Sequence, residues 1–235
     1  MINENGRIGG AGINLAGVRQ SLIQNNLIYD NHAAGIAEWD NGNAFDAATV
    51  TPGPRTAAEV TGAEVLPLFG CIDNIVRNNT VLSSVRGRAA LLVGNGSWGT
   101  RAYNNVLVND EMPSVQLLNT SIWRFEAGNN VLDQVSYEGP AGAMKELAIS
   151  LPDSVSSVTG VTRQSLSSSF EKSGDEPWIV LEGNWWKLNA RRPDFHPRAG
   201  APLLAGRGDA RHEPTRDLDG RMRSTHDIGA FVERR

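Results

Sequence analysis

The 235-residue chain contains a single cysteine, Cys71, which excludes an intrachain disulfide, a CxxC site and a zinc cluster built on thiolates. Aromatic residues make up only 6%, so the core is expected to be mainly aliphatic. No run approaches the roughly 18 apolar residues that a membrane helix needs, which argues against a membrane span. The first residues lack the basic and apolar regions of a signal peptide. A strand-like pattern begins almost at once, so we expect this chain to lack an N-terminal cap.

Charge is unevenly distributed along the chain. Residues 187–235 carry 11 Lys and Arg against 7 Asp and Glu, whereas residues 1–186 carry 11 against 19. A nucleic-acid surface usually needs a dense basic stripe, but the arginines of the tail alternate with acids. The pattern therefore argues against a nucleic-acid partner and predicts ion pairing within the tail.

An internal repeat is the most informative feature of the sequence. Four segments share an Asn-Asn-x-aliphatic core: residues 24–28, 77–81, 103–107 and 128–132. Their first asparagines lie 53, 26 and 25 residues apart, and the interval of 53 predicts two periods with one copy obscured by an insertion. Gly183-Asn184-Trp185-Trp186 is a looser fifth copy.

A second column of short apolar strands keeps the same register about 13 residues before each Asn pair. Its members are residues 12–15, 65–68, 90–93 and 114–117, and residues 35–39 fit the copy predicted to be hidden. Asparagine tolerates the left-handed backbone of a sharp turn, and coils stacked about 4.8 Å apart let equivalent amides form a hydrogen-bonded ladder. The repeat therefore predicts an all-β fold, a parallel β-solenoid.

These coils resemble the pectin-lyase-like superfamily of right-handed parallel β-helices. The C-terminal motifs Asp194-Phe195-His196-Pro197, Gly200-Ala201-Pro202-Leu203, 217–223 and 227–233 resemble the closing segment of bacterial choice-of-anchor Q proteins. Ala201 departs from the serine usual in that family. The resemblance implies an exported or cell-surface bacterial protein of a family whose members usually lack a defined activity.

We expect one domain, residues 1–235. Residues 1–139 form coils interrupted by a loop insertion at 40–64, residues 140–178 form an irregular insertion, and residues 179–235 supply the last strands and a C-terminal cap. Short helical turns are expected at 143–147 and 162–166. A solenoid must cover its last coil, and charged hydrogen bonds can satisfy that end. The side chains expected to form them are Arg221, Arg223, Asp217, Asp219 and Asp227.

The insertion is the predicted place for a binding site, because insertions in solenoids gather on one face. Glu38, Asp40 and Asp46 are the candidate catalytic acids, and Trp39 is a flat platform for a sugar ring. Acids that merely solvate a loop are the alternative. Ile36 and Trp39 imply opposite registers, which leaves open whether Glu38 or Ala37 faces outward.

Further candidates for contacts with a substrate lie on the coils: Arg86, Arg88, Trp98 and Arg101. A polyuronate lyase needs a cation to neutralise the substrate carboxylate and a base to take the adjacent proton. No Asp cluster has the spacing of a Ca²⁺ loop and the four histidines lack zinc spacing, so no metal or cofactor is expected. Only the superfamily resemblance implies that calcium could be bound.

Apart from the Asn pairs, a second row of turn residues occupies equivalent positions, shortly after each pair. Its acids, Asp30, Asp110 and Asp133, stack at spacings of about 5 to 10 Å, which suits a glycosidase pair. Asp also simply favours turns, which is the competing interpretation.

Two functional hypotheses follow. The first is a domain that binds or processes an extended polysaccharide or oligosaccharide; if it is an enzyme, it is a polysaccharide lyase or a glycoside hydrolase. The alternative is a non-catalytic structural or adhesive segment of a larger cell-surface protein. An uncapped first coil near residues 9–15 also predicts self-association.

Overall fold

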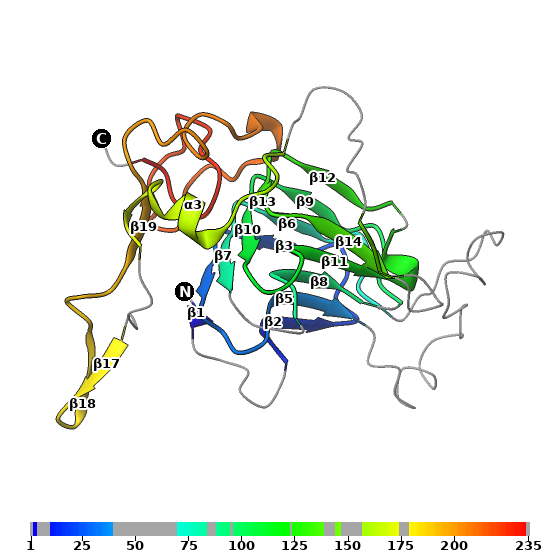
Figure 1. Ribbon diagram of the computed structural model, residues 1–235, viewed down its shortest axis with the longest axis horizontal. Coiled ribbons are helices and arrows are strands. Elements are labelled where there is room, and N and C mark those ends of the chain that lie inside the picture. Colours follow the sequence, from blue (N-terminus) through cyan, green and yellow to red (C-terminus); the bar gives the residue numbers. More distant parts are fainter. Residues whose placement is uncertain are drawn as a thin grey trace.

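The computed structural model describes residues 2–3, 10–39, 70–83, 88–94, 96–122, 124–138, 144–146, 157–173 and 179–233. Within these residues the protein is built from three stacks of short strands, each running parallel to its neighbours except at one end (Figure 1). Asp40, Asp46, Arg86 and strand 65–68, all named from the sequence, lie outside the described residues. This all-β arrangement is consistent with the predicted β-solenoid.

Three sheets make up the stack. Sheet 1 contains β1 (Ile2–Asn3), β4 (Leu27–Tyr29), β7 (Thr80–Ser83), β10 (Val106–Asn109) and β13 (Val131–Leu132). Sheet 2 contains β2 (Ala11–Ala16), β5 (Ala34–Trp39), β8 (Leu91–Val93), β11 (Val115–Leu118), β14 (Val135–Glu138) and the antiparallel β15 (Met144–Glu146). Sheet 3 contains β3 (Leu22–Gln24), β6 (Ile75–Arg77), β9 (Arg101–Tyr103) and β12 (Glu126–Gly128).

The chain visits sheet 3, sheet 1 and sheet 2 in turn, then repeats this order one strand further along. Inward-facing aliphatic side chains from all three sheets form one core. Examples are Val76, Val81 and Leu91, one from each sheet. Alternation of side chains along each strand places the intervening residues on the outer faces.

The interval of 53 residues between the first two Asn pairs is one coil, not two. β4 pairs directly with β7, with Leu27 opposite Thr80. Strand β5 is a regular member of sheet 2, between β2 and β8, rather than a hidden copy. The additional residues therefore enlarge a single connection, from sheet 2 to sheet 3.

The two asparagines of each pair have different roles. The first takes the left-handed backbone that the turn requires, with φ between 47° and 56° at Asn25, Asn78, Asn104 and Asn129. The second forms the predicted ladder. Its members, in chain order, are Asn26, Asn79, Asn105 and Asn130. From Asn79 on, the side-chain Oδ1 of each member accepts two hydrogen bonds from the member before it, one from its backbone N–H and one from its Nδ2–H, at 2.9 to 3.0 Å.

A second layer covers the outer face of sheet 1. It contains α3 (Arg163–Ser167), β16 (Phe170–Lys172), β19 (Asp194–Pro197), η2 (Ala210–His212) and the turns that follow (Figure 1). Phe170, Phe195 and Phe231 are buried there against Tyr29 and its neighbours in sheet 1. We name residues 157–173 and 189–233 the outer layer.

The tail was expected to cover the last coil, but it lies along the side of the stack. Asn25, Asn78, Asn104 and Asn129 each donate from Nδ2 to a backbone oxygen between residues 207 and 229. The last coil is instead followed by β15 in sheet 2 and by a parallel bridge from Val131 to Val158 in sheet 1. The side-chain amides at the turns thus dock the tail across four coils.

The ion pairing expected within the tail is found at Arg211, whose guanidinium lies 2.7 Å from Oδ2 of Asp209, whereas Arg223 makes other contacts. The Arg223 guanidinium donates to the backbone oxygens of Asp227 and Gly229 and to Oδ1 of Asn25, at 2.8 to 3.1 Å. The Asp227 carboxylate accepts from the backbone N–H groups of Gly206 and Glu233, each at 2.8 Å. Because the tail is irregular, many of its backbone N–H and C=O groups form no hydrogen bonds within a sheet. These side chains supply the hydrogen bonds instead.

Three local predictions have different outcomes. The helical turn expected at 162–166 is confirmed as α3, with Thr162 as its N-cap. The one expected at 143–147 is wrong, because residues 144–146 form strand β15. The fifth copy of the repeat is also wrong: Gly183 and Asn184 form the turn of an antiparallel hairpin, β17 (Ile179–Glu182) and β18 (Trp185–Leu188), which extends away from the stack in Figure 1.

Candidate functional site

Glu38 lies inside the stack. Its register partners in sheet 2 are Leu15 and Val93, both of which contribute to the core, and its side chain is fully buried. This settles the register that the sequence left open, because Ala37 belongs to a separate cluster on the opposite face of the strand. A buried Glu38 cannot contact a polymer on the surface, so the catalytic role predicted for it does not fit its position.

Trp39 and Arg88 come together at the end of β5. The Trp39 indole donates from Nε1 to Oδ1 of Asn14 at 2.7 Å. The Arg88 guanidinium lies over its ring, 5.4 Å from the centroid. The structure therefore joins two of the predicted substrate contacts, but on the sheet 2 side of the stack, apart from the other two.

Trp98 and Arg101 lie beside sheet 3. Trp98 is buried, and the guanidinium of Arg124 lies 5.4 Å from its ring centroid. Arg101 lies in β9, in a groove of about 390 Å³ on the outer face of sheet 3. The lining residues are Gln20, Ser21, Leu22, Asp73, Ile75, Gly99, Arg101, Arg124 and Glu126.

Stacked turns build one wall of this groove. Gln20, Asp73, Gly99 and Arg124 occupy equivalent positions in successive coils, and all have φ between 50° and 73°. Glycine at position 99 leaves room for a neighbouring side chain, because a Cβ atom there would approach Oδ1 of Asp73 to 2.4 Å. That carboxylate instead pairs with Arg124, whose nitrogen lies 3.1 Å from the same oxygen.

The floor is formed by alternate residues of sheet 3. Val76, Ala102 and Ala127 face the core, so the residues on either side of them face outward. The outward positions form two columns along the stack: Leu22, Ile75, Arg101 and Glu126 in one, and Gln24, Arg77, Tyr103 and Gly128 in the other. Arg101 forms no ion pair with any residue that the structure describes, and its register partner in β12 is Glu126.

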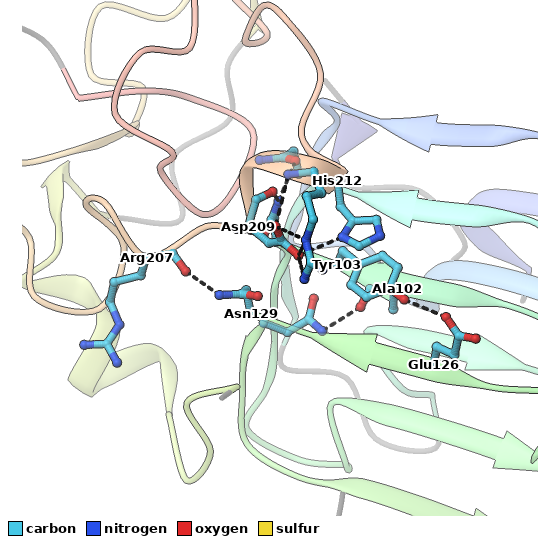
Figure 2. A network of polar contacts seen from close by, with 11 residues as sticks. Ala102, Tyr103, Glu126, Asn129, Arg207, Asp209 and His212 are labelled. Carbon is cyan, nitrogen blue, oxygen red and sulfur yellow. Dashed lines mark hydrogen bonds and ion pairs between the residues drawn. The ribbon is translucent and has the colours of Figure 1, made fainter. Parts of the chain in front are cut away.

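Contacts from the outer layer close one side of the floor, as Figure 2 shows. The His212 ring stacks on Tyr103 with centroids 3.8 Å apart and an interplanar angle of 13°. The Tyr103 hydroxyl donates to Oε2 of Glu126 at 2.7 Å. Burial and this carboxylate raise the pKa of Tyr103 to about 12, so the phenol stays protonated.

Asp209 holds His212 in place. Its Oδ2 lies 2.9 Å from Nδ1 of His212. The neighbouring Arg211 guanidinium also binds this carboxylate and holds the pKa of Asp209 far below its usual range. The backbone N–H of Asp209 donates to Oδ1 of Asn104 at 2.7 Å, which connects the group to a turn of the coils.

Asp30 and Asp110, two of the three acids of the second row, contact α3. Oδ1 of Asp30 binds the Arg163 guanidinium at 2.7 Å, and Oδ1 of Asp110 accepts the Arg163 backbone N–H at 2.9 Å. Within the described residues, no group of three or more His, Cys, Asp or Glu side chains could hold a metal ion. No helix there is long and apolar enough to cross a membrane.

Sequence reasoning named Arg101 but missed most of the groove. Tyr103 and Glu126 could have been found from the repeat, because each precedes an Asn pair and stands beside a core alanine. His212 could not, because nothing in the tail predicts which coil it contacts. The chain matches no protein-family model, no curated protein and no solved structure.

Proposed function

We propose that the protein binds an extended polysaccharide along the groove of sheet 3. The observation that carries this proposal is the groove itself, with Arg101 at its floor and the Tyr103–His212 stack beside it. Neighbouring coils lie about 4.8 Å apart, a distance comparable with the length of one sugar residue. A polymer laid along the stack would therefore meet an equivalent position at each successive coil.

The arginines in and beside the groove would suit a polymer that carries carboxylates, although Asp73 and Glu126 also line it. Arg101 and Arg124 line it, and Arg77 lies on the adjacent column, where it donates to Oε1 of Gln24 at 2.9 Å. Guanidinium groups bind carboxylates with two parallel hydrogen bonds. Asp73 is already paired with Arg124, and Glu126 accepts from Tyr103, so both acids of the lining have partners.

We further infer that the stack is a right-handed parallel β-helix of the pectin-lyase-like type, with a tail of the choice-of-anchor Q kind. Support comes from the parallel sheets, the Asn ladder and the tail motifs. On this proposal the protein is exported by a bacterium and acts at the cell surface or outside it. Binding alone is proposed; cleavage by a lyase or a hydrolase is an outcome of the test.

The alternative function, a structural or adhesive segment, has one observation in its favour. β2 and β3 end their sheets, with β5 and β6 as their respective neighbours. Strand edges of this kind pair readily with another chain. Self-association through β2 and β3 is therefore the partner proposed under this alternative.

The test is retention on immobilised neutral and uronic-acid polysaccharides, with and without Ca²⁺, while new reducing ends and unsaturated uronate are followed. Arg101→Ala is expected to weaken retention on uronic-acid polymers roughly 10- to 100-fold, because a charged hydrogen bond contributes about 1.5–3 kcal/mol. Arg191→Ala, at an exposed arginine of the outer layer, is the matched control and should bind normally. Equal binding by both variants, or none by the unaltered protein, would refute the proposal and favour the structural alternative.

A further inference from the structure

The carboxyl group of Glu38 is an unusual feature of the core. It occupies a position that Leu15 and Val93 fill in the adjacent coils, where the surroundings are aliphatic. Oε2 accepts a hydrogen bond from Oγ1 of Thr100 at 2.7 Å. Oε1 is buried and has no hydrogen-bond partner among the described residues. An ionised carboxylate would be poorly stabilised there, since no described cation contacts it.

The groups that face this carboxyl come from three elements. Thr100 and Asn74 occupy equivalent positions just before β9 and β6, and both favour the charged form of Glu38. The thiol of Cys71, buried near the ends of β2 and β5, is the titratable neighbour within the described chain. Burial and the charge of Glu38 raise the pKa of Cys71 to about 11, so this thiol stays neutral.

Glu38 lies directly behind the groove. Thr100 stands between Gly99 and Arg101 in the sequence, and Asn74 stands between Asp73 and Ile75. These four flanking residues all line the groove. The backbone that carries them is therefore tied to the interior by the side chains of Thr100 and Asn74.

We propose that Glu38 is an internal pH switch of the groove, whose protonated carboxyl holds the coil closed and whose ionisation loosens the segments behind Asp73 and Arg101. In the opened state the carboxylate of Glu38 is exposed to water, which stabilises its charge. Thr100 and Asn74 are then no longer in their positions next to Glu38. As a regulation of ligand binding, this inference rests on the proposed function. The opening itself is independent of any ligand.

Physical linkage sets the pH range of the switch. Burial raises the pKa of Glu38 from 4.5 to about 7 in the closed coil. A carboxyl exposed by opening returns to its ordinary value, so the population of the open state rises about tenfold per pH unit between pH 5 and 7. Above pH 7 the increase levels off, at a total on the order of 100-fold.

Cys71 reports on this opening, because it is the single cysteine of the chain and is buried beside Glu38. The experiment measures the rate at which a pyridyl disulfide labels the full chain between pH 4.5 and 8.5. Labelling takes place in the opened state, where the thiol is exposed in both proteins, so dividing the rate of the unaltered protein by that of Glu38→Gln at each pH cancels the ionisation of the thiol. The ratio is expected to rise on the order of 100-fold and to reach a plateau above pH 7.

Glu171→Gln is the matched control, because it makes the same chemical change at an exposed position of the outer layer. Its labelling should follow the unaltered protein at every pH. If the ratio to Glu38→Gln is flat, or if Glu171→Gln has the same effect, the switch is overturned. Thr100→Val gives a second test, since loss of its hydrogen bond to Glu38 should extend the rise to higher pH before it levels off.

Binding of a uronic-acid polymer is then measured over the same pH range. The expected result is binding that weakens from pH 5 to 7 in the unaltered protein and changes less in Glu38→Gln. Binding that is equally pH-dependent in both overturns the regulatory link. If labelling follows the expected ratio but no polymer binds at any pH, the proposed function fails while the internal switch stands.

Discussion

The coils and the outer layer are stabilised in different ways. In the coils, one backbone pattern recurs, and a single residue type at one corner satisfies equivalent groups in every turn of the stack. In the outer layer, strands are short, and many backbone groups are satisfied by individual side chains such as Asp217 and Asp227. The first region relies on repetition and the second on contacts that occur once.

This difference shows where single changes should matter most. A change in the middle of the ladder disturbs the coil on either side of it, because each amide contacts both neighbours. A change in the outer layer disturbs one contact and its surroundings. We therefore expect the coils to depend on their interior asparagines, and the outer layer to depend on its aromatic core.

Asn105→Ala should have the largest effect, a loss of roughly 4–6 kcal/mol in the free energy of unfolding, because unsatisfied buried groups cost about 1–3 kcal/mol each. Asn105 accepts from Asn79 and donates to Asn130 and to the backbone oxygen of Val76. Urea unfolding gives the measurement. Asn26→Ala, at the half-buried end of the ladder, should lose only about 1 kcal/mol, and equal losses at both positions would contradict the ladder account.

Phe195→Ala should destabilise the outer layer by about 3–5 kcal/mol, the usual loss for a buried phenylalanine. Phe195 is 2% exposed and lies 5.2 Å from Tyr29 and 5.3 Å from Phe170, centroid to centroid. Limited proteolysis should then cut the outer layer before the coils. Trp185→Ala, at a 74% exposed aromatic of the hairpin, is the control and should change little. Coils that are cut first would mean that the outer layer is the more stable region.

Glu38→Gln should stabilise the protein above pH 7 by up to about 3 kcal/mol. The pKa of Glu38 is raised from 4.5 to about 7 on folding, so the unfolded chain loses its proton first as pH rises. The stability of the unaltered protein is therefore full below pH 4.5, falls between pH 4.5 and 7, and is constant above. Thermal unfolding at pH 4.5 and pH 8 tests this, and a stabilisation of the same size at both values would contradict it.

The smallest effect is expected at Asn129. Two substitutions there separate the two roles of the first asparagine in a pair, its left-handed backbone and its side-chain hydrogen bond. Asn129 has φ of 47° and donates from Nδ2 to the backbone oxygen of Arg207 at 2.7 Å. Asn129→Gly keeps the backbone freedom and loses the contact, so it should cost about 1 kcal/mol. Asn129→Ala loses both and should cost roughly a further 1 kcal/mol. Equal stability of the two variants, measured by urea unfolding, would mean that the turn conformation contributes nothing.

The repeated part of the sequence was also the part whose fold could be predicted. The Asn pairs recur with offsets that only stacked coils explain, so the sheets and the ladder followed from the sequence. The interval of 53 residues was misread, because a pattern of residues cannot tell one enlarged coil from two ordinary ones. Gly183-Asn184 was misread for a similar reason, since the same residue types form a hairpin turn as readily as a coil turn.

The candidate site was harder to predict. The direction of Glu38 depends on which face of β5 packs inward, and the neighbouring Ile36 and Trp39 gave conflicting signals. Arg101 was named, but its neighbours in the groove come from other coils and became adjacent only through the register. The contact of His212 with Tyr103 depends on where the irregular tail packs against the coils. No local sequence pattern predicts that position.

The ladder of asparagines also has a direction. The amides of Asn26, Asn79 and Asn105 each donate to Oδ1 of the next member along the chain, so their side-chain dipoles point the same way. The backbone N–H of Asn130 donates to Oγ of Ser157 at 3.2 Å, which takes the place of the next amide oxygen. A hydroxyl can receive this bond but has no amide to extend the series. The hydrogen bonds of the side chains thus run in one direction along the stack, and the ladder ends at the hydroxyl of Ser157.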